Sequence, residues 1–260
     1  MATQAFSGFF AEFYDILHAG LEDVPAYLQF ASRCGRRVLE LGSGTGRVLI
    51  PLAVAGFTAT GIDSSKDMVA VCRERLLYEP PDVRSRATVI EADARGFELN
   101  ERFDLIIAPC NFINYFSVPG DSEGILRWIG AHLNTAGTFL LDNGVPDLGH
   151  MHEVNGVARE YEFEHPLTGT SIIYRVTSRY DLARQLEHAR MDLEERGDGG
   201  EPLRSEKAEE TLAYYFPDQM RAMLDAAGFG IAHEQGSLQE DIPISDDGGE
   251  MVFLCRQKDE

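Results

Sequence analysis

Residues 38–48 read Val-Leu-Glu-Leu-Gly-Ser-Gly-Thr-Gly-Arg-Val, a short apolar run that leads into glycines at alternate positions. The apolar run predicts a buried strand over 37–41, and the glycines predict a tight loop over 42–46. Glycines just beyond a strand end, here Gly42 and Gly44, let the backbone pass close to a ligand. A tight turn without a ligand is the alternative.

The spacing of these glycines separates two kinds of cofactor. A dinucleotide-binding loop of the form Gly-x-Gly-x-x-Gly would need glycine at position 47, where this chain has Arg47. Glu40 precedes the loop and suits a cofactor that bears an ammonium group rather than a pyrophosphate. The loop therefore disfavours a dehydrogenase.

Beyond the loop, predicted helices and strands alternate in a rhythm typical of a parallel sheet wound on both sides. Ser64 and Asp67 have the spacing of a capping box at the start of a helix. The run 103–108 is nearly continuous in apolar residues, as expected of a strand covered on both faces. The pattern predicts helices at 47–55, 64–78 and 125–133, and strands at 58–62, 87–90, 103–108 and 138–141.

Three further segments complete the chain. Apolar residues at helical intervals predict two short amphipathic helices within 9–31. A helix at 217–227 and strands around Ile231 and 251–255 close the chain. After Pro146, four long runs predict an antiparallel sheet with one wet face, at 157–164, 171–180, 186–195 and 203–214.

The predicted fold class is α/β, a Rossmann-like doubly wound and mostly parallel seven-stranded sheet with an N-terminal helical lid and an inserted antiparallel sheet. We predict the lid over 1–33, the core over 34–147 and 215–260, and the insertion over 148–214. The insertion would serve as a cap over the substrate or as the contact of a homodimer.

Carboxylates end two of the predicted parallel strands, at the sheet edge where the glycine loop lies. Asp63 follows the loop by about twenty residues, where a carboxylate can take both ribose hydroxyls of a nucleoside. Asp93 ends the next strand and could accept from an adenine amino group, with a turn-forming role as the alternative. Met68 could cover the adenine ring or could be plain helix core.

Composition limits the partners. The 260 residues carry a formal net charge of −20, which disfavours nucleic acid and anionic lipid because both usually bind clustered Lys and Arg. We find no signal-peptide pattern and no apolar run of the ~18 residues that suggest a membrane span. The four cysteines include no Cys-x-x-Cys pair, and only His150 and His152 are close histidines. We therefore expect a cytoplasmic protein without a metal site or a disulfide framework.

Several motifs together resemble those of class I S-adenosylmethionine-dependent methyltransferases. Besides 38–48, these are Gly61-Ile-Asp63, Glu91-Ala-Asp93 and Phe103-Asp-Leu-Ile-Ile107. The likeness extends over nearly the whole chain to a bacterial small-molecule branch that includes aminodeoxysugar N,N-dimethyltransferases. The segments that carry this second likeness are Tyr14-Asp15, the antiparallel insertion, Tyr214-Tyr-Phe-Pro217 and Ala227-Gly-Phe229.

The resemblance implies S-adenosylmethionine as cofactor and S-adenosylhomocysteine as product. Glu40 and Gly42 would then meet the amino-acid end of the cofactor, and Asp63 would hold the ribose. Asp93 with Ala94 would contact the adenine, and Tyr14 would close over the cofactor from the lid. The segment Pro109-Cys-Asn-Phe112 matches neither the acidic motif of nucleic-acid amino-methylating enzymes nor that of the sugar enzymes, so the acceptor is less defined than the cofactor.

A small-molecule amine is the expected methyl acceptor. An O-methyltransferase of a secondary metabolite and a non-catalytic cofactor-binding subunit stay open. A hydroxyl would need a base, for which His18 and His165 are the candidates, whereas a neutral amine needs none during attack. Arg175 would select a carboxylate or phosphate on the acceptor. The candidate substrate contacts are Asn111, Tyr115, Asn143, Tyr161, Tyr174, Arg175 and Tyr215.

Overall fold

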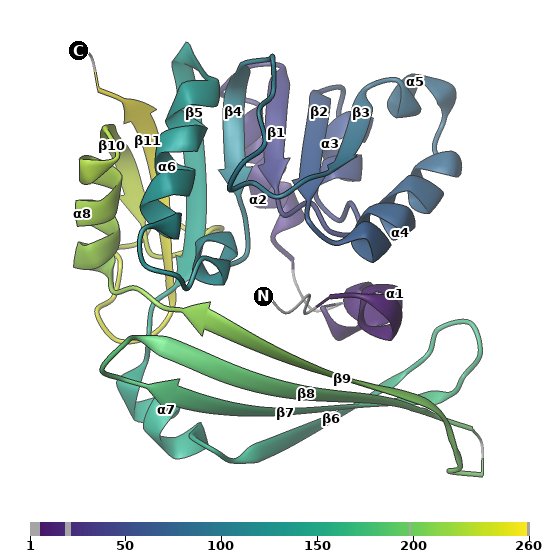
Figure 1. Ribbon diagram of the computed structural model, residues 1–260. Coiled ribbons are helices and arrows are strands. Elements are labelled where there is room, and N and C mark those ends of the chain that lie inside the picture. Colours follow the sequence, from purple (N-terminus) through teal and green to yellow (C-terminus); the bar gives the residue numbers. More distant parts are fainter. Residues whose placement is uncertain (1–5, 19–21, 198, 259–260) are drawn as a thin grey trace.

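A seven-stranded sheet forms the centre of the computed structural model, which describes residues 6–18, 22–197 and 199–258 (Figure 1). The strand order is β10-β11-β5-β4-β1-β2-β3. The five strands from β3 to β5 run parallel, and β11 is antiparallel to both of its neighbours. Their bounds are β1 Arg37–Leu41, β2 Thr58–Asp63, β3 Ala87–Glu91, β4 Phe103–Ala108, β5 Leu133–Gly144, β10 Phe229–Gln235 and β11 Glu250–Gln257.

Helices cover both faces of this sheet because its central strands are apolar on both sides. In β4, Ile106 packs with one face and Leu105 with the other. The first face carries α6 and α8, and the second carries α2, α3 and α4. The helices are α1 Gly8–Leu17, α2 Val24–Ala31, α3 Leu49–Val54, α4 Lys66–Leu77, α5 Pro81–Arg84, η1 Phe112–Tyr115, α6 Asp121–His132, α7 Leu148–Val154 and α8 Pro217–Ala226.

The inserted segment forms a separate four-stranded antiparallel sheet in the order β6-β7-β8-β9. One face of it, which we call the inner face, packs Ile172, Met191 and Leu193 against Phe9 and Phe13 of α1. Figure 1 shows α1 lying between this sheet and the core. The strands are β6 Ala158–Glu164, β7 Ser171–Asp181, β8 Leu186–Arg196 and β9 Pro202–Ala213.

The predicted fold class is confirmed, because the chain combines a mostly parallel seven-stranded sheet with a separate antiparallel sheet. The division into lid, core and insertion as domains stays a prediction. No helix among the described residues is long and apolar enough to cross a membrane.

One local prediction is wrong by a single residue. The N-cap of α4 is Ser65, whose Oγ accepts from the backbone N–H of Met68 at 3.3 Å. The capping box predicted from Ser64 to Asp67 thus places the N-cap one residue too early, and Asp67 accepts from the backbone N–H of Gly8 at 2.7 Å. Asp67 thus fastens α1 to the start of α4.

Candidate functional site

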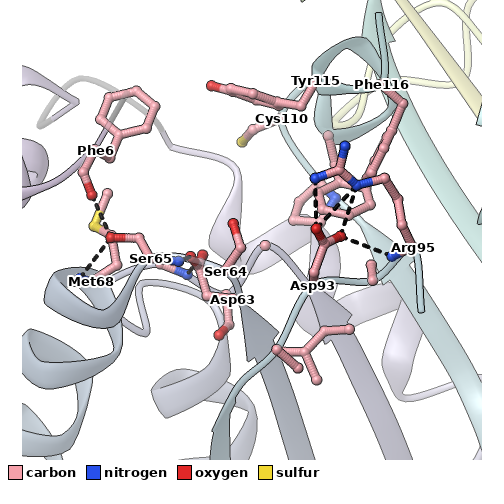
Figure 2. A pocket seen from close by; sticks show the side chains of 18 of the residues that line it. Phe6, Asp63, Ser64, Ser65, Met68, Asp93, Arg95, Cys110, Tyr115 and Phe116 are labelled. Carbon is pink, nitrogen blue, oxygen red and sulfur yellow. Dashed lines mark hydrogen bonds and ion pairs between the residues drawn. The ribbon is translucent and has the colours of Figure 1, made fainter. Parts of the chain in front are cut away.

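A cavity of about 580 Å³ opens between the carboxyl ends of the parallel strands and the antiparallel sheet. Strand ends contribute Glu40, Asp63 and Asp93 to its lining, η1 contributes Tyr115, and β9 contributes Glu210. Figure 2 shows Asp63 and Asp93 on the floor and the Tyr115 ring extending over them. All eight predicted cofactor residues line this one cavity: Tyr14, Glu40, Gly42, Gly44, Asp63, Met68, Asp93 and Ala94.

The glycine loop can follow its path only because side chains are absent. Gly42, Gly44 and Gly46 all have positive φ, at 67°, 53° and 83°. A Cβ on Gly42 would lie 2.8 Å from the ring of Phe112, whereas one on Gly44 would lie 4.0 Å from its nearest neighbour, the Gly42 carbonyl oxygen. The Phe112 ring therefore packs directly on the backbone of Gly42, whereas no side chain in the described part of the chain packs as closely on Gly44.

Gly42→Ala is expected to destabilise the protein more than Gly169→Ala. Both glycines have positive φ, which costs alanine about 1–2 kcal/mol, but a Cβ at Gly169 meets nothing within 4 Å. The contact with Phe112 should add roughly 1 kcal/mol at Gly42. Urea unfolding of both variants measures the difference, and equal losses would show that Phe112 yields without cost.

Asp63 ties the loop to the end of β2. Its Oδ2 accepts from the backbone N–H of Gly44 and its Oδ1 from that of Ser65, each at 2.8 Å. Burial raises the pKa of the Asp63 carboxyl, and these two hydrogen bonds oppose the rise. Each oxygen accepts one backbone N–H, so each retains acceptor capacity for a ligand hydroxyl.

Glu40 is a buried carboxylate, and one of its two oxygens has no hydrogen-bond partner among the described residues. Its side chain is 3% exposed, and that oxygen is Oε2. Burial raises the pKa of Glu40 well above its usual range, and the nearby Arg47 guanidinium opposes that rise. Arg47 itself is committed to Asp23 through both terminal nitrogens and lies 3.1 Å from the Cys110 Sγ. An unpaired acceptor beside a glycine loop is the chemistry that an ammonium group would complete.

Asp93 already has a partner, which sequence reasoning missed. Arg95 lies two residues further on and donates to both Asp93 oxygens at 2.6 to 3.1 Å (Figure 2). This guanidinium holds the pKa of the Asp93 carboxyl below its usual value. Arg95 also reaches Asp121 at 3.5 Å, so it connects Asp93 to the start of α6.

A buried network supports the floor of the cavity. The Asp142 carboxyl at the end of β5 accepts from the Tyr27 hydroxyl at 2.8 Å and from the backbone N–H of Cys110 at 2.9 Å. Burial raises the pKa of Asp142 to about 7. The network joins α2 to the segment after β4, where Cys110 and Asn111 adopt positive φ.

Most of the predicted substrate contacts lie outside the cavity lining. Tyr115 lines it. Three others tie loops together: Asn111 accepts from the Gly144 N–H at 2.6 Å, Asn143 donates to Asn114 at 2.6 Å, and the Tyr215 hydroxyl pairs with Ser122 at 2.7 Å. Their contact with a substrate stays a prediction.

The candidates on the insertion divide between its two faces. Tyr174 lies on the inner face, stacked on Tyr161 with ring centroids 6.2 Å apart. Arg175 is its neighbour in sequence and lies on the opposite face, where it pairs with Glu160 at 2.6 Å and Glu194 at 3.5 Å. Strand geometry therefore turns the predicted anion-binding arginine away from the cavity.

Neither candidate base lines the cavity. His18 ends α1, where its ring stacks on Tyr14 and Nδ1 lies 2.8 Å from the Tyr14 carbonyl oxygen. Burial lowers the pKa of His18. His165 sits in the β6–β7 turn and accepts from the backbone N–H groups of Leu167 and Thr168. Both histidines have structural partners, and a catalytic role for either stays a prediction.

Glu210 is a further lining residue that sequence reasoning did not find. The period-two pattern of residues 203–214 places it on the same face as Ala208, which packs on the inner face. Its Oε2 is buried and has no hydrogen-bond partner among the described residues. The alternation was therefore a usable signal, but it could not reveal which face would meet the cavity.

Comparison with known proteins finds sequence similarity within the core. Residues 38–137 match the model of a methyltransferase-domain family. A putative methyltransferase of Bacillus subtilis is 28% identical over 135 residues, covering 51% of this chain and 53% of that protein. The Streptomyces fradiae dTDP-3-amino-3,6-dideoxy-alpha-D-glucopyranose N,N-dimethyltransferase is 28% identical over 145 residues, covering 53% and 54%. The chain thus spans about half the length of each of these two relatives.

Similarity of structure extends further than similarity of sequence. The CcbJ methyltransferase from Streptomyces caelestis superposes with a TM-score of 0.80 at 21% identity, covering 98% of both chains. The likeness therefore includes the antiparallel insertion and the N-terminal helices as well as the core. At this identity the superposition establishes the fold.

Proposed function

We propose that the chain transfers a methyl group from S-adenosylmethionine to an amine nitrogen of a small molecule, a function that the match of residues 38–137 to a methyltransferase-domain family supports. The observation that carries this proposal is the buried Glu40 carboxylate, which has an unpartnered oxygen beside the glycine loop. A cofactor with an ammonium group supplies the missing partner.

The lining residues fit this cofactor at each of its three parts. Glu40 and Gly42 would hold its amino-acid end, because Glu40 offers a buried negative charge and Gly42 brings backbone to the cavity lining beside it. Asp63 would accept from the ribose hydroxyls with its remaining lone pairs. Asp93 and Met68 would hold and cover the adenine. Once bound, the cofactor supplies an electrophilic methyl group on a sulfonium.

The chain's own contribution to the reaction is position and exclusion of water. Phe112 and Tyr115 line the cavity and would close it around the acceptor, and Tyr14 lines it from the N-terminal helix. Holding an acceptor nitrogen in line with the methyl group removes much of the entropy cost of a bimolecular step. A cavity of about 580 Å³ suits a cofactor together with a small acceptor and supports a small-molecule substrate.

The proposal of an amine rests on chemistry and on one relative. A neutral amine needs no base at the moment of attack, whereas a hydroxyl usually does. The Streptomyces fradiae relative carries an amino-sugar N,N-dimethyltransferase name. We also propose that the insertion, residues 148–214, caps the acceptor, since Glu210 and Thr211 of β9 line the cavity.

Parallel calorimetric titrations with S-adenosylmethionine, S-adenosylhomocysteine and NAD test the cofactor assignment. We expect the first two to bind and NAD not to bind, because Arg47 stands where a dinucleotide loop needs glycine. Mass spectrometry of reactions with paired amino and hydroxyl sugar nucleotides then tests the acceptor. Binding of NAD alone would contradict the cofactor, and methylation of the hydroxyl compounds alone would contradict the amine.

A further inference from the structure

Glu210 presents a carboxylate to the cavity from the side opposite the glycine loop. It lies near the end of β9, and Ala189 is its cross-strand partner on β8. Glu210 and Thr211 are the residues through which the antiparallel sheet reaches the cavity lining. Among the described residues its Oε2 has no hydrogen-bond partner and almost no contact with solvent. Burying a charged group without a partner costs free energy, and a ligand that pairs with it removes that cost.

The groups around Glu210 do not supply a positive partner. Glu187 of β8 acts on it as a like charge, and burial together with that charge raises the pKa of Glu210 to about 7. Tyr174 of β7 and Tyr115 of η1 face it with neutral hydroxyls; burial raises the pKa of both, and the Glu210 charge adds to the rise. Across the cavity, Asp63 and Tyr14 add further acidic groups. The arginines of the lining, Arg47 and Arg95, are paired with Asp23 and Asp93. Arg159 of β6 acts on Tyr174 and is not among the groups that shift the pKa of Glu210. The surroundings of Glu210 are therefore complementary to a cation.

We propose that Glu210 recognises the amino group of the methyl acceptor, pairing with its ammonium form and taking one proton from it before methyl transfer. This inference rests on the proposed function and specifies how the antiparallel sheet takes part in it. Glu40 would then bind the ammonium group of the cofactor, and Glu210 would bind that of the acceptor.

The proton and electron balance of the step is complete without a further reactant. One N–H bond of the acceptor ammonium breaks, and the proton forms an O–H bond on Glu210, which leaves a neutral amine. The nitrogen lone pair then forms the new N–C bond while the methyl–sulfur bond breaks and its electron pair stays on sulfur. The product nitrogen is again a cation, and Glu210 releases its proton to solvent when the product leaves.

Kinetics of Glu210→Gln with a panel of amino sugar nucleotides test the assignment. We expect kcat/KM to fall by about 100-fold or more, the usual scale for losing a positioned acid or base, with S-adenosylhomocysteine affinity unchanged. The wild-type rate should fall as the pH drops below about 7, because a protonated Glu210 can neither pair with an ammonium nor accept its proton. Glu210→Gln should not show this fall in rate at low pH, and Glu210→Asp should restore part of the rate.

Glu209→Gln is the matched control. Glu209 is the preceding residue on β9, is exposed, and pairs with Arg190 at 2.6 Å on the opposite face of the sheet. It should keep wild-type kinetics. If Glu210→Gln methylates amines at the wild-type rate, the inference is overturned while the proposed function stands. If the wild-type protein methylates no amine in the panel, the proposed function itself fails.

Stability provides a second readout that needs no acceptor. The Glu210 carboxyl binds its proton more tightly in the folded protein, at about 7, than at its ordinary value of 4.5. The folded state therefore loses stability relative to the unfolded chain as the pH rises from about 4.5 to 7. Glu210→Gln should resist urea better than wild type at pH 8. A loss of stability at that pH would mark Glu210 as a structural residue and overturn the inference.

Discussion

Asp63→Ala is expected to weaken S-adenosylmethionine binding by about 1–3 kcal/mol, the scale of losing hydrogen bonds to a charged group. Asp63 has two tasks that this change removes together. It would hold the ribose hydroxyls, and it fixes the glycine loop by accepting from the N–H of Gly44 at 2.8 Å. Calorimetry of the folded variant measures the loss.

Two controls separate these tasks. Asp82→Ala changes an exposed aspartate whose carboxylate pairs with Arg86 at 3.0 Å, and it should leave cofactor affinity unchanged. Asp63→Asn keeps one acceptor oxygen and should lose less affinity than Asp63→Ala. Unchanged affinity in a folded Asp63→Ala protein would remove Asp63 from the cofactor site.

The order of the core elements could be predicted because it depends on local signals. The strands at 37–41 and 103–108 have the predicted bounds, since the mostly apolar runs there end at glycine or proline. The four strands of the insertion also follow the predicted runs, with each end within one residue. A strand's own residues decide these features, and distant contacts do little to change them.

The partners of individual side chains could not be predicted in the same way. The period of two along β7 places Tyr174 and Arg175 on opposite faces, but it does not say which face meets the core. The phenylalanines of α1 decide that, by packing on Ile172 and Leu193. The same contact turns Arg175 outward and leaves Glu210 facing the cavity. A residue-level site on an inserted sheet thus depends on tertiary packing that no local pattern contains.

The predicted cofactor residues come together for a different reason. Parallel strands have their carboxyl ends at one edge, so Glu40, Asp63 and Asp93 had to converge once the strand order was right. This convergence does not reveal which hydrogen-bond partners each carboxylate has. Asp93 is paired with Arg95, Asp63 is hydrogen-bonded by the backbone, and Glu40 retains an unpartnered oxygen. Of the three, Glu40 should therefore respond most strongly to a bound cation.

Glu40→Gln is expected to weaken S-adenosylmethionine binding by about 2–5 kcal/mol, the cost of removing one partner from a buried charge pair. The same change should stabilise the protein without ligand above the ordinary carboxyl pKa. Burial raises the pKa of Glu40 in the folded state, so keeping it ionised there costs stability that glutamine does not cost. Binding and stability should thus change in opposite directions.

The pH dependence of binding supplies the decisive comparison. The raised pKa of Glu40 means that the free protein holds a proton there at low pH, and an ammonium ligand must displace it. Wild-type affinity should therefore fall as the pH drops, with proton release measurable by calorimetry in buffers of different ionisation enthalpy. Glu40→Gln should lose this dependence, whereas Glu101→Gln, an exposed residue paired with Arg37, should keep it. An unchanged pH dependence in Glu40→Gln would mean that another group meets the ammonium, and the unpaired oxygen of Glu40 would then need a different partner.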